Sequence, residues 1–282
     1  MPFITVPGRN DPDVELRYDD VGAGKPVVLV QGWPLSSRSW DGQVPALVDA
    51  GYRVITYHRR GFGQSSQPWN GYDYDTLAAD LKVVFDTLDL RDVILIGFSM
   101  GSGEVARYVS TYGTDRRAEI VFASARPPYL WKSDDNPDGG IDAALAQWFH
   151  DGLTGDRPGF LHEFVRMFFT AGPPSPVNKP RVSPEQIAFN LHIAEMASPK
   201  GTLDCTTAFA TTDFRADLTK ITVPTLVIHG GSDTVVPFEV SGKRTHEAIS
   251  GSELVLIEDA PHGLTVSHRD EWNRHVLAFL AT

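Results

Sequence analysis

The most constraining feature of this chain is an apolar run that leads directly into a serine flanked by glycines. Residues 93–96, Val-Ile-Leu-Ile, are typical of a buried strand, and Gly-Phe-Ser-Met-Gly follows at 97–101. Residues 100–112 carry apolar side chains at helical spacing, and Gly113 predicts where that helix ends. A serine in so sharp a strand-to-helix turn is expected in strained backbone, and small residues on either side let the turn close. This geometry would project the Ser99 hydroxyl above a sheet edge, as a nucleophile requires.

The order of predicted strands and helices indicates a mostly parallel sheet. Short apolar runs typical of buried strands recur at 27–30, 53–57, 93–96, 119–123, 225–229 and 253–257. Segments of helical length lie between them, such as 74–88, and a last helix is expected around 270–280. This alternation predicts an α/β fold with crossover helices on both faces of the sheet.

Between residues 126 and 215 the alternation stops. Proline- and glycine-rich turn signals divide this segment into helical pieces, and it contains no convincing strand. One helix start is marked by Ser183-Pro184-Glu185-Gln186, with serine as the N-cap and proline in the first turn. We therefore predict a catalytic core made of residues 1–125 and 216–282, interrupted by a helical cap at 126–215.

Two further residues stand where a serine nucleophile would need partners. A serine hydroxyl reacts only when a base accepts its proton and a third group orients that base. Asp233 follows the predicted strand 225–229, and His262 follows the predicted strand 253–257. In an open parallel sheet the loops at the carboxyl ends of the strands form the ligand crevice. Ser99, Asp233 and His262 are therefore predicted to converge as nucleophile, acid and base, in the chain order that such sheets favour.

Each partner has an alternative interpretation. An aspartate in a Gly-Gly-Ser-Asp loop is by itself typical of a turn, and a histidine before glycine is more often a surface or capping residue. Asp259 is the alternative acid, but it lies only three residues from His262, and a structural role in the loop is favoured. Other histidines fall at a strand end or in helical regions and are weaker candidates for the base: His229, His246, His268 and His275.

An acyl-transfer site also needs two N–H donors where negative charge develops on the substrate. One is expected to be the backbone N–H of Met100, directly after the nucleophile. The loop after the strand 27–30 reads Gln31-Gly32-Trp33-Pro34, and Trp33 is its natural donor because proline has no N–H. An ordinary Gly-Pro turn with a core tryptophan is the alternative.

Taken together, these motifs resemble one branch of the α/β-hydrolase family, the cofactor-free haloperoxidases, which also contains aryl esterases, perhydrolases and γ-lactamases. The matching segments are Gly-Trp-Pro-Leu (32–35), Arg-Arg-Gly-Phe-Gly-Gln-Ser (59–65), Tyr-Asp-Tyr-Asp-Thr (72–76), Gly-Phe-Ser-Met-Gly (97–101), Thr-Asp-Phe-Arg (212–215), Val-Pro-Thr-Leu-Val-Ile-His-Gly (223–230) and Ala-Pro-His-Gly (260–263). The resemblance is weak across the predicted cap. It implies a metal-independent hydrolase of small esters or lactams that needs no cofactor. The residues it assigns are Ser99, Asp233 and His262 as the triad, with Trp33 and Met100 as amide donors.

Three positions bear on what the resemblance implies. The family usually has histidine before Gly-Trp and aspartate before Arg-Arg-Gly, where this chain has Gln31 and His58. Glutamine can still donate and accept hydrogen bonds, so Gln31 is expected to hold the loop, whereas His58 replaces a fixed negative charge with a titratable group. Pro34 resembles the haloperoxidase-type members, which implies a perhydrolase or haloperoxidase side activity.

The predicted cap holds much of the aromatic content of the chain. At helical spacing a single aromatic residue usually belongs to a core, but together they indicate an apolar acyl or ring pocket beneath the cap. The residues are Tyr129, Trp131, Trp148, Phe149, Phe160, Phe164, Phe168, Phe169 and Phe189.

Composition argues against several other classes of function. The formal net charge of −11 argues against nucleic acid and anionic membranes as partners, because both bind a basic face. The single cysteine, Cys205, allows no intrachain disulfide and no cysteine-based metal cluster, and the 9 histidines lack metalloprotease spacing. No signal peptide and no membrane-length apolar run is visible, so a cytoplasmic protein with a small-molecule substrate is expected. A homo-oligomer is left open.

Three competing functions share parts of these motifs. Gly101-Ser102-Gly103 with Ala106 matches a dinucleotide-binding fingerprint, but its first glycine falls within the predicted helix and not in the turn before it. A C–C bond hydrolase of ring-cleavage products would use the same triad. A receptor that kept the hydrolase shell would share the fold without turnover.

Overall fold

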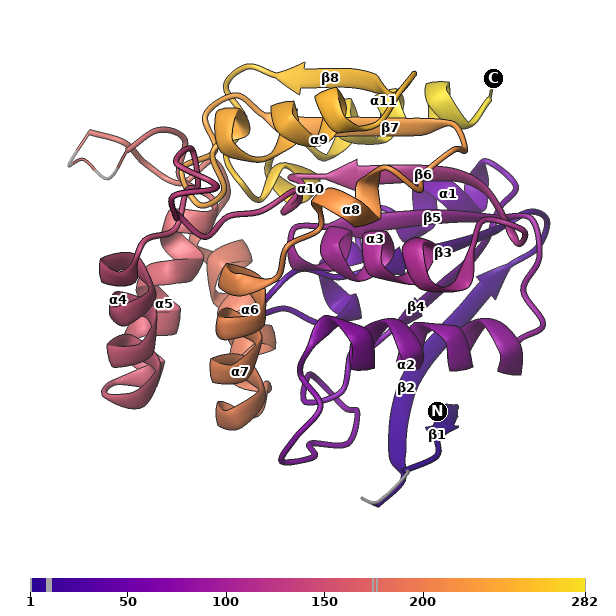
Figure 1. Ribbon diagram of the computed structural model, residues 1–282, viewed down its shortest axis with the longest axis horizontal. Coiled ribbons are helices and arrows are strands. Elements are labelled where there is room, and N and C mark those ends of the chain that lie inside the picture. The colour runs from indigo at the N-terminus through magenta and orange to yellow at the C-terminus, as the bar shows by residue number, and fades with distance from the viewer. Residues whose placement is uncertain (1, 9–11, 174, 176, 282) are drawn as a thin grey trace.

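A sheet of eight strands forms the centre of the structure, a computed structural model that describes residues 2–8, 12–173, 175 and 177–281 (Figure 1). The strands are β1 (Phe3–Val6), β2 (Val14–Gly22), β3 (Pro26–Val30), β4 (Arg53–Tyr57), β5 (Val93–Phe98), β6 (Arg117–Ala123), β7 (Thr225–Gly230) and β8 (Glu253–Ile257). Their order is β1-β2-β4-β3-β5-β6-β7-β8. The β1–β2 and β2–β4 pairs are antiparallel and the other pairs are parallel. The mostly parallel α/β sheet is confirmed, with β1 and β2 as strands that the sequence patterns did not predict.

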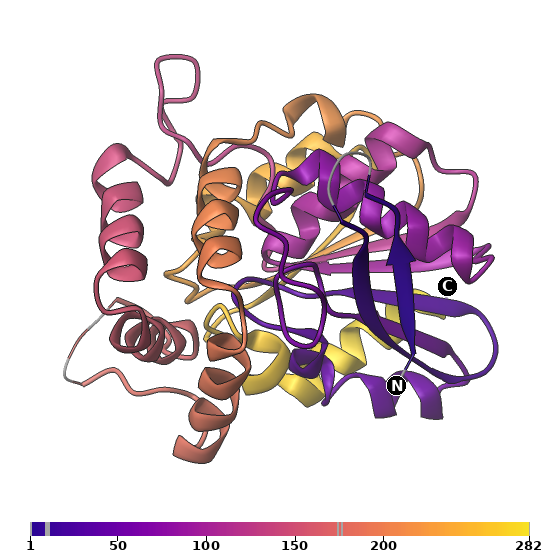
Figure 2. The ribbon, with the colours of Figure 1, turned by 90° about the horizontal axis from the view of Figure 1, so that it is seen from below.

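Helices cover both faces of this sheet, as Figures 1 and 2 show. One face carries α2 (Tyr74–Thr87), α3 (Met100–Tyr112), α8 (Arg215–Leu218) and α9 (Gly242–Ala248). The other carries α1 (Val44–Asp49), α10 (Leu264–Ser267) and α11 (Arg269–Leu280). Two short 3-10 helices, η1 (Ser37–Trp40) and η2 (Phe238–Val240), lie in the connections. The helices predicted at 74–88, 100–112 and 270–280 thus correspond to α2, α3 and α11.

Between β6 and β7 the chain forms four further helices beyond the carboxyl ends of the parallel strands (Figure 1). They are α4 (Ala143–Thr154), α5 (Arg157–Phe168), α6 (Pro184–Glu195) and α7 (Pro199–Thr211). The helix α6 begins where predicted, with the Ser183 side chain accepting a hydrogen bond from the Gln186 N–H. The described part of this segment contains isolated β-bridges and no strand. We propose that these helices form the cap expected at 126–215.

A buried arginine joins the first residues of that segment to its end. The Arg126 guanidinium is fully buried, donates hydrogen bonds to the carbonyls of Phe209 and Thr212, and lies 4.7 Å from the centre of the Phe214 ring. Burial lowers the pKa of Arg126 to about 10, so the group stays charged at neutral pH. Carbonyl oxygens and aromatic faces compensate for the loss of hydration of this charge. Arg126 thus joins the first residues of the proposed cap to its last residues.

No helix within the described ranges has both the length and the apolar character that crossing a membrane requires.

Candidate active site

Ser99 lies in the turn between β5 and α3, and its backbone is strained as the sequence predicted. Its φ and ψ are 52° and −118°, a combination that L-amino acids rarely adopt. A Cβ added to Gly97 would lie 2.8 Å from the Gly101 oxygen, and one added to Gly101 would lie 2.4 Å from the Val30 oxygen. Only glycine fits at either position, so both allow the turn to close and to present the serine.

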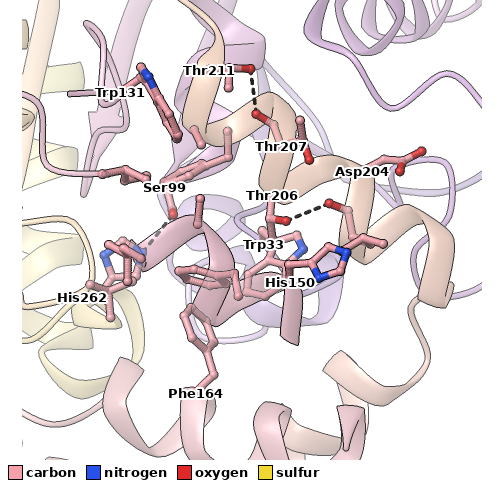
Figure 3. Close-up of a pocket in the computed structure, with 18 residues that line it drawn as sticks. Trp33, Ser99, Trp131, His150, Phe164, Asp204, Thr206, Thr207, Thr211 and His262 are labelled. Carbon is pink, nitrogen blue, oxygen red and sulfur yellow. Dashed lines mark hydrogen bonds between the residues drawn. The ribbon is translucent and has the colours of Figure 1, made fainter. Parts of the chain in front are cut away.

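The structure brings Ser99, Asp233 and His262 together. His262 Nε2 lies 2.9 Å from Ser99 Oγ (Figure 3), and His262 Nδ1 lies 2.7 Å from Asp233 Oδ2. The three residues are 4%, 5% and 1% exposed, in the order Ser99, Asp233, His262. An ionised carboxylate only accepts hydrogen bonds, so His262 carries its proton on Nδ1 and accepts the serine hydroxyl at Nε2. The predicted convergence of the three side chains is thus present in the geometry.

Several donors surround the buried Asp233 carboxylate. The backbone N–H groups of Val235 and Val236 donate to Oδ1 at 2.9 and 2.8 Å, and His229 Nε2 lies 3.3 Å from Oδ2. Burial alone would raise the pKa of Asp233, but His262 and His229 outweigh burial and hold that pKa well below its usual range. The Asp233 side chain therefore stabilises its own turn, as its loop sequence indicated, and it remains an ionised carboxylate beside His262.

The loop that carries His262 is held by Ser124, which the sequence patterns did not single out, and by Phe168, one of the aromatic residues predicted to form a pocket. The buried Ser124 hydroxyl donates to the His262 carbonyl at 3.0 Å, from a backbone with φ of 42°. The Gly263 N–H donates to the Phe168 carbonyl at 2.9 Å, and the Phe168 ring packs edge-on against the imidazole at 4.7 Å. These contacts fix the position of the imidazole from both the sheet and α5.

The loop after β3 lies directly against Ser99. A Cβ added to Gly32 would lie 3.1 Å from Ser99 Cβ and 2.8 Å from Phe98 Cδ1, so glycine permits this approach. The Trp33 indole Nε1 donates to the Thr202 carbonyl at 3.1 Å, which orients the ring beside Ser99 (Figure 3). Within the described residues the Trp33 backbone N–H has no hydrogen-bond acceptor. The Met100 N–H stands at the first position of α3, where no carbonyl of the helix can accept it.

Gln31 holds the loop after β3, as expected for a residue that can both donate and accept. With its amide nitrogen facing Tyr57, the side chain donates to the Tyr57 carbonyl at 2.8 Å and accepts from the Arg59 N–H at 2.7 Å. The Arg59 guanidinium donates to the Gln31 carbonyl at 2.8 Å and pairs with the buried Glu104 at 2.9 Å. The peptide before Gly32 is thus fixed from two sides.

His58 is buried and uncharged at neutral pH. Its Nδ1 accepts a hydrogen bond from the Gln64 N–H at 2.7 Å. Burial, together with the positive charge of Arg17, lowers the pKa of His58 to about 4. The position that is negatively charged in the family's usual pattern is therefore neutral here.

A cavity of about 340 Å³ opens over Ser99 and His262 (Figure 3). Its apolar lining residues are Trp33, Trp131, Ile141, Leu145, Ala146, Phe149, Phe164, Leu203, Phe209, Ala210 and Val235. Polar atoms lie along its edge, from His150, Asp204, Thr206, Thr207 and Thr211. A cavity of this volume and character suits a small apolar ligand.

The aromatic residues predicted to form a pocket divide into three groups. Trp131, Phe149 and Phe164 line the cavity. The rings of Phe160, Phe168 and Phe169 belong to the buried core. Trp148 is 43% exposed, and the half-buried Tyr129 and Phe189 do not line the cavity either. Much of the cavity wall comes instead from α7, which the sequence patterns did not assign to a pocket.

The alternative acid and bases lie away from the Ser99 hydroxyl. The Asp259 side chain is 64% exposed and faces Arg181 and His268 at 3.6 and 3.3 Å. His246 Nδ1 contacts the Ser252 hydroxyl at 2.8 Å. Asp259 thus takes the structural role in the loop that the sequence favoured.

Two other kinds of site would need a dinucleotide-binding turn or a cluster of metal ligands. Gly103 of the dinucleotide-like motif lies inside α3, where an added Cβ would meet the rings of Phe214 and Tyr74 at 2.8 Å, so this glycine allows helix packing. In the part of the chain that the structure describes, no group of three or more His, Cys, Asp and Glu side chains is placed to hold a metal ion.

Comparison with known proteins identifies the family. The sequence profile of the alpha/beta hydrolase fold family matches residues 25–168. A non-heme chloroperoxidase of Kitasatospora aureofaciens is 41% identical and aligns over 95% of this chain and 96% of its own length. A bifunctional esterase/perhydrolase of Acinetobacter calcoaceticus is 36% identical over 95% of this chain and 96% of its own. The crystal structure of a bromoperoxidase from Bacillus anthracis superposes with a TM-score of 0.95 and 55% identity, covering 100% of this chain and 99% of that one. The chain therefore belongs to the α/β hydrolase family, in its branch of cofactor-free haloperoxidases and esterases.

Proposed function

We propose that this protein is a serine hydrolase that cleaves small carboxylic esters through an acyl-enzyme on Ser99. The observation that carries the proposal is the hydrogen-bonded series Ser99–His262–Asp233 at the base of an apolar cavity. The relatives named as esterase/perhydrolase and chloroperoxidase support the same chemistry. Cyclic amides are a second substrate class for the same steps, since a lactam carbonyl accepts the same attack.

The proposed reaction has two halves. Ser99 Oγ attacks the ester carbonyl while His262 Nε2 takes its proton, and the oxyanion is stabilised by the N–H groups of Trp33 and Met100. The C–O bond to the alcohol breaks as His262 returns the proton to the leaving oxygen. Water then attacks the acyl-enzyme carbonyl while His262 takes its proton. The bond between Ser99 Oγ and the acyl carbon breaks as His262 returns that proton to Ser99 Oγ, and the acid is released. Asp233 holds the imidazole tautomer and stabilises the imidazolium in both halves.

A substrate panel tests the proposed class. The cavity is small and mostly apolar, so phenyl acetate is expected to exceed tributyrin in kcat/KM by about tenfold or more. The purified protein would be assayed with phenyl acetate, tributyrin, a γ-lactam and a ring-cleavage diketone. Faster turnover of tributyrin would contradict the preference for small acyl groups. Cleavage of the diketone alone would favour a C–C hydrolase, and no turnover of any substrate would favour a non-catalytic receptor.

We further propose perhydrolysis as a side activity of the same acyl-enzyme. Hydrogen peroxide replaces water in the attack on an acetylated Ser99 and leaves as peracetic acid. The peracid then oxidises bromide to hypobromous acid and returns to acetic acid. Pro34 fixes its own φ and so restrains the Trp33 carbonyl, which is proposed to accept a hydrogen bond from peroxide.

Bromination of monochlorodimedone tests this side activity. In acetate buffer with peroxide and bromide, the wild type is expected to brominate, and Pro34→Leu is expected to lower the rate by about tenfold because peroxide loses its placement. Ser99→Ala is expected to abolish the reaction. Equal bromination by wild type and Ser99→Ala, or equal rates with and without acetate, would remove the acyl-enzyme route.

A further inference from the structure

A second histidine contacts the proposed catalytic acid. His229, in β7, is 0% exposed, and its Nε2 lies 2.9 Å from the Val236 carbonyl and 3.3 Å from Asp233 Oδ2. Both oxygens only accept hydrogen bonds, so Nε2 carries the proton and donates to the Val236 carbonyl. The sequence had suggested His229 only as a weak candidate for the base, and the structure places it behind the acid instead.

The surroundings of the other ring nitrogen fix this tautomer. His229 Nδ1 is buried and has no hydrogen-bond partner among the described residues. A Cβ added to Gly242 would lie 2.4 Å from Nδ1, and the Phe238 ring packs 5.6 Å from the imidazole. A proton on Nδ1 would have no acceptor, so the Nε2–H tautomer is the one that the packing supports.

His229 also anchors the turn that presents the acid. Its Nε2–H binds the carbonyl of Val236, and the N–H of the same Val236 donates to Asp233 Oδ1 at 2.8 Å. One oxygen of the carboxylate is thus held by the N–H of a residue whose carbonyl His229 binds. The other oxygen, Oδ2, is shared between His262 Nδ1 at 2.7 Å and His229 Nε2 at 3.3 Å.

We propose that His229 is a positioning residue for the reaction, one that sets the orientation and the charge of the Asp233 carboxylate on which His262 depends. The inference rests on the proposed function of the triad. The partial positive charge of the His229 N–H draws electron density from Oδ2, which moderates how strongly that oxygen stabilises protonated His262. Without His229 the carboxylate gains freedom to rotate, and Oδ2 interacts with His262 alone.

The pH dependence of kcat/KM distinguishes a positioning role of His229 from a purely structural role, because a structural role would leave that dependence unchanged. Among the described residues, Asp233 is the ionisable group that contacts His229, and His262 contacts the same carboxylate. The contacts of His229 from η2 and α9, Phe238 and Gly242, are uncharged. The pKa of Asp233 is held well below its usual range, so Asp233 stays ionised throughout an assay from pH 5 to 8. The acid limb of kcat/KM then reports the group that takes the serine proton, and not Asp233.

Two variants of similar size separate positioning from packing. His229→Gln keeps an N–H donor near the place of imidazole Nε2, whereas the shorter amide in His229→Asn cannot reach Val236 or Asp233. We expect His229→Asn to lower kcat for phenyl acetate by about tenfold, the effect of losing one hydrogen bond near a charged group, with KM little changed. We also expect its acid limb to move to higher pH by about half a pH unit. His229→Gln should keep both kcat and the acid limb close to wild type.

The control variant is His246→Gln, at a half-buried histidine of α9 that contacts Ser252 and not the triad. It should match the wild type in kcat and in acid limb. A cooperatively folded His229→Asn with wild-type kcat and acid limb would overturn the inference. A folded His229→Gln whose kcat falls by about tenfold from wild type would also overturn it, and this result decides the matter if His229→Asn does not fold. An inactive wild type would instead be a failure of the proposed function.

Discussion

Replacing Ser99 by alanine is expected to lower kcat for p-nitrophenyl acetate by on the order of 10⁴-fold or more. The variant keeps Cβ but lacks the oxygen that lies 2.9 Å from His262 Nε2, so no acyl-enzyme can form. Alanine carries the same backbone strain as serine at φ of 52°, so folding should be preserved. Steady-state kinetics on the purified variant, with a thermal unfolding curve beside it, measures the effect.

The matched control is Ser110→Ala, on the same helix α3 but away from the cavity. It should hydrolyse p-nitrophenyl acetate at the wild-type rate. Near-normal hydrolysis by a folded Ser99→Ala variant would show that another group carries the chemistry.

Replacing Asp233 by asparagine is expected to cost about 10³- to 10⁴-fold in kcat. The amide is neutral, so it cannot stabilise protonated His262, and its NH₂ group favours the wrong imidazole tautomer. The loss should also exceed that from the exposed alternative acid, since the Asp259 side chain is 64% exposed and pairs with Arg181 and His268. Kinetics of Asp233→Asn and Asp259→Asn, compared at one pH above the acid limb, separates the two carboxylates. The assignment fails if Asp259→Asn loses the activity and Asp233→Asn keeps it.

The central strands could be predicted because each contains an uninterrupted apolar stretch. Nearly all residues of β3, β5 and β7 are buried, and each of these strands has at least three apolar residues in succession. By contrast, β2 is an antiparallel strand near the edge, with the sequence Val-Glu-Leu-Arg-Tyr-Asp-Asp-Val-Gly and several exposed residues. Its charged positions obscure the alternation that would mark a strand, and β1 pairs only with β2.

The convergence of Ser99, Asp233 and His262 could be predicted because the parallel sheet fixes where the three residues lie. Each residue follows a strand, and the strand ends meet at one edge whatever the intervening loops do. The cavity wall from α7 could not be predicted, because Leu203 and Phe209 reach the cavity only through the packing of the helix against the core. The contacts of Ser124 and His229 could not be predicted either. Ser124 binds the His262 carbonyl and His229 contacts the Asp233 carboxylate, and no spacing in the sequence indicates these contacts.

Covalent labelling tests the central claim most directly. Phenylmethanesulfonyl fluoride reacts with a serine whose proton is taken by a neighbouring base, so the wild type should gain one sulfonyl group and lose its esterase activity. Mass spectrometry of the digested protein should place that group on the peptide containing Ser99. His262→Ala should react far more slowly, because Ser99 Oγ then lacks the acceptor at 2.9 Å. A sulfonyl group on any other residue, or equal labelling of wild type and Ser99→Ala, would contradict the assignment of Ser99 as the nucleophile.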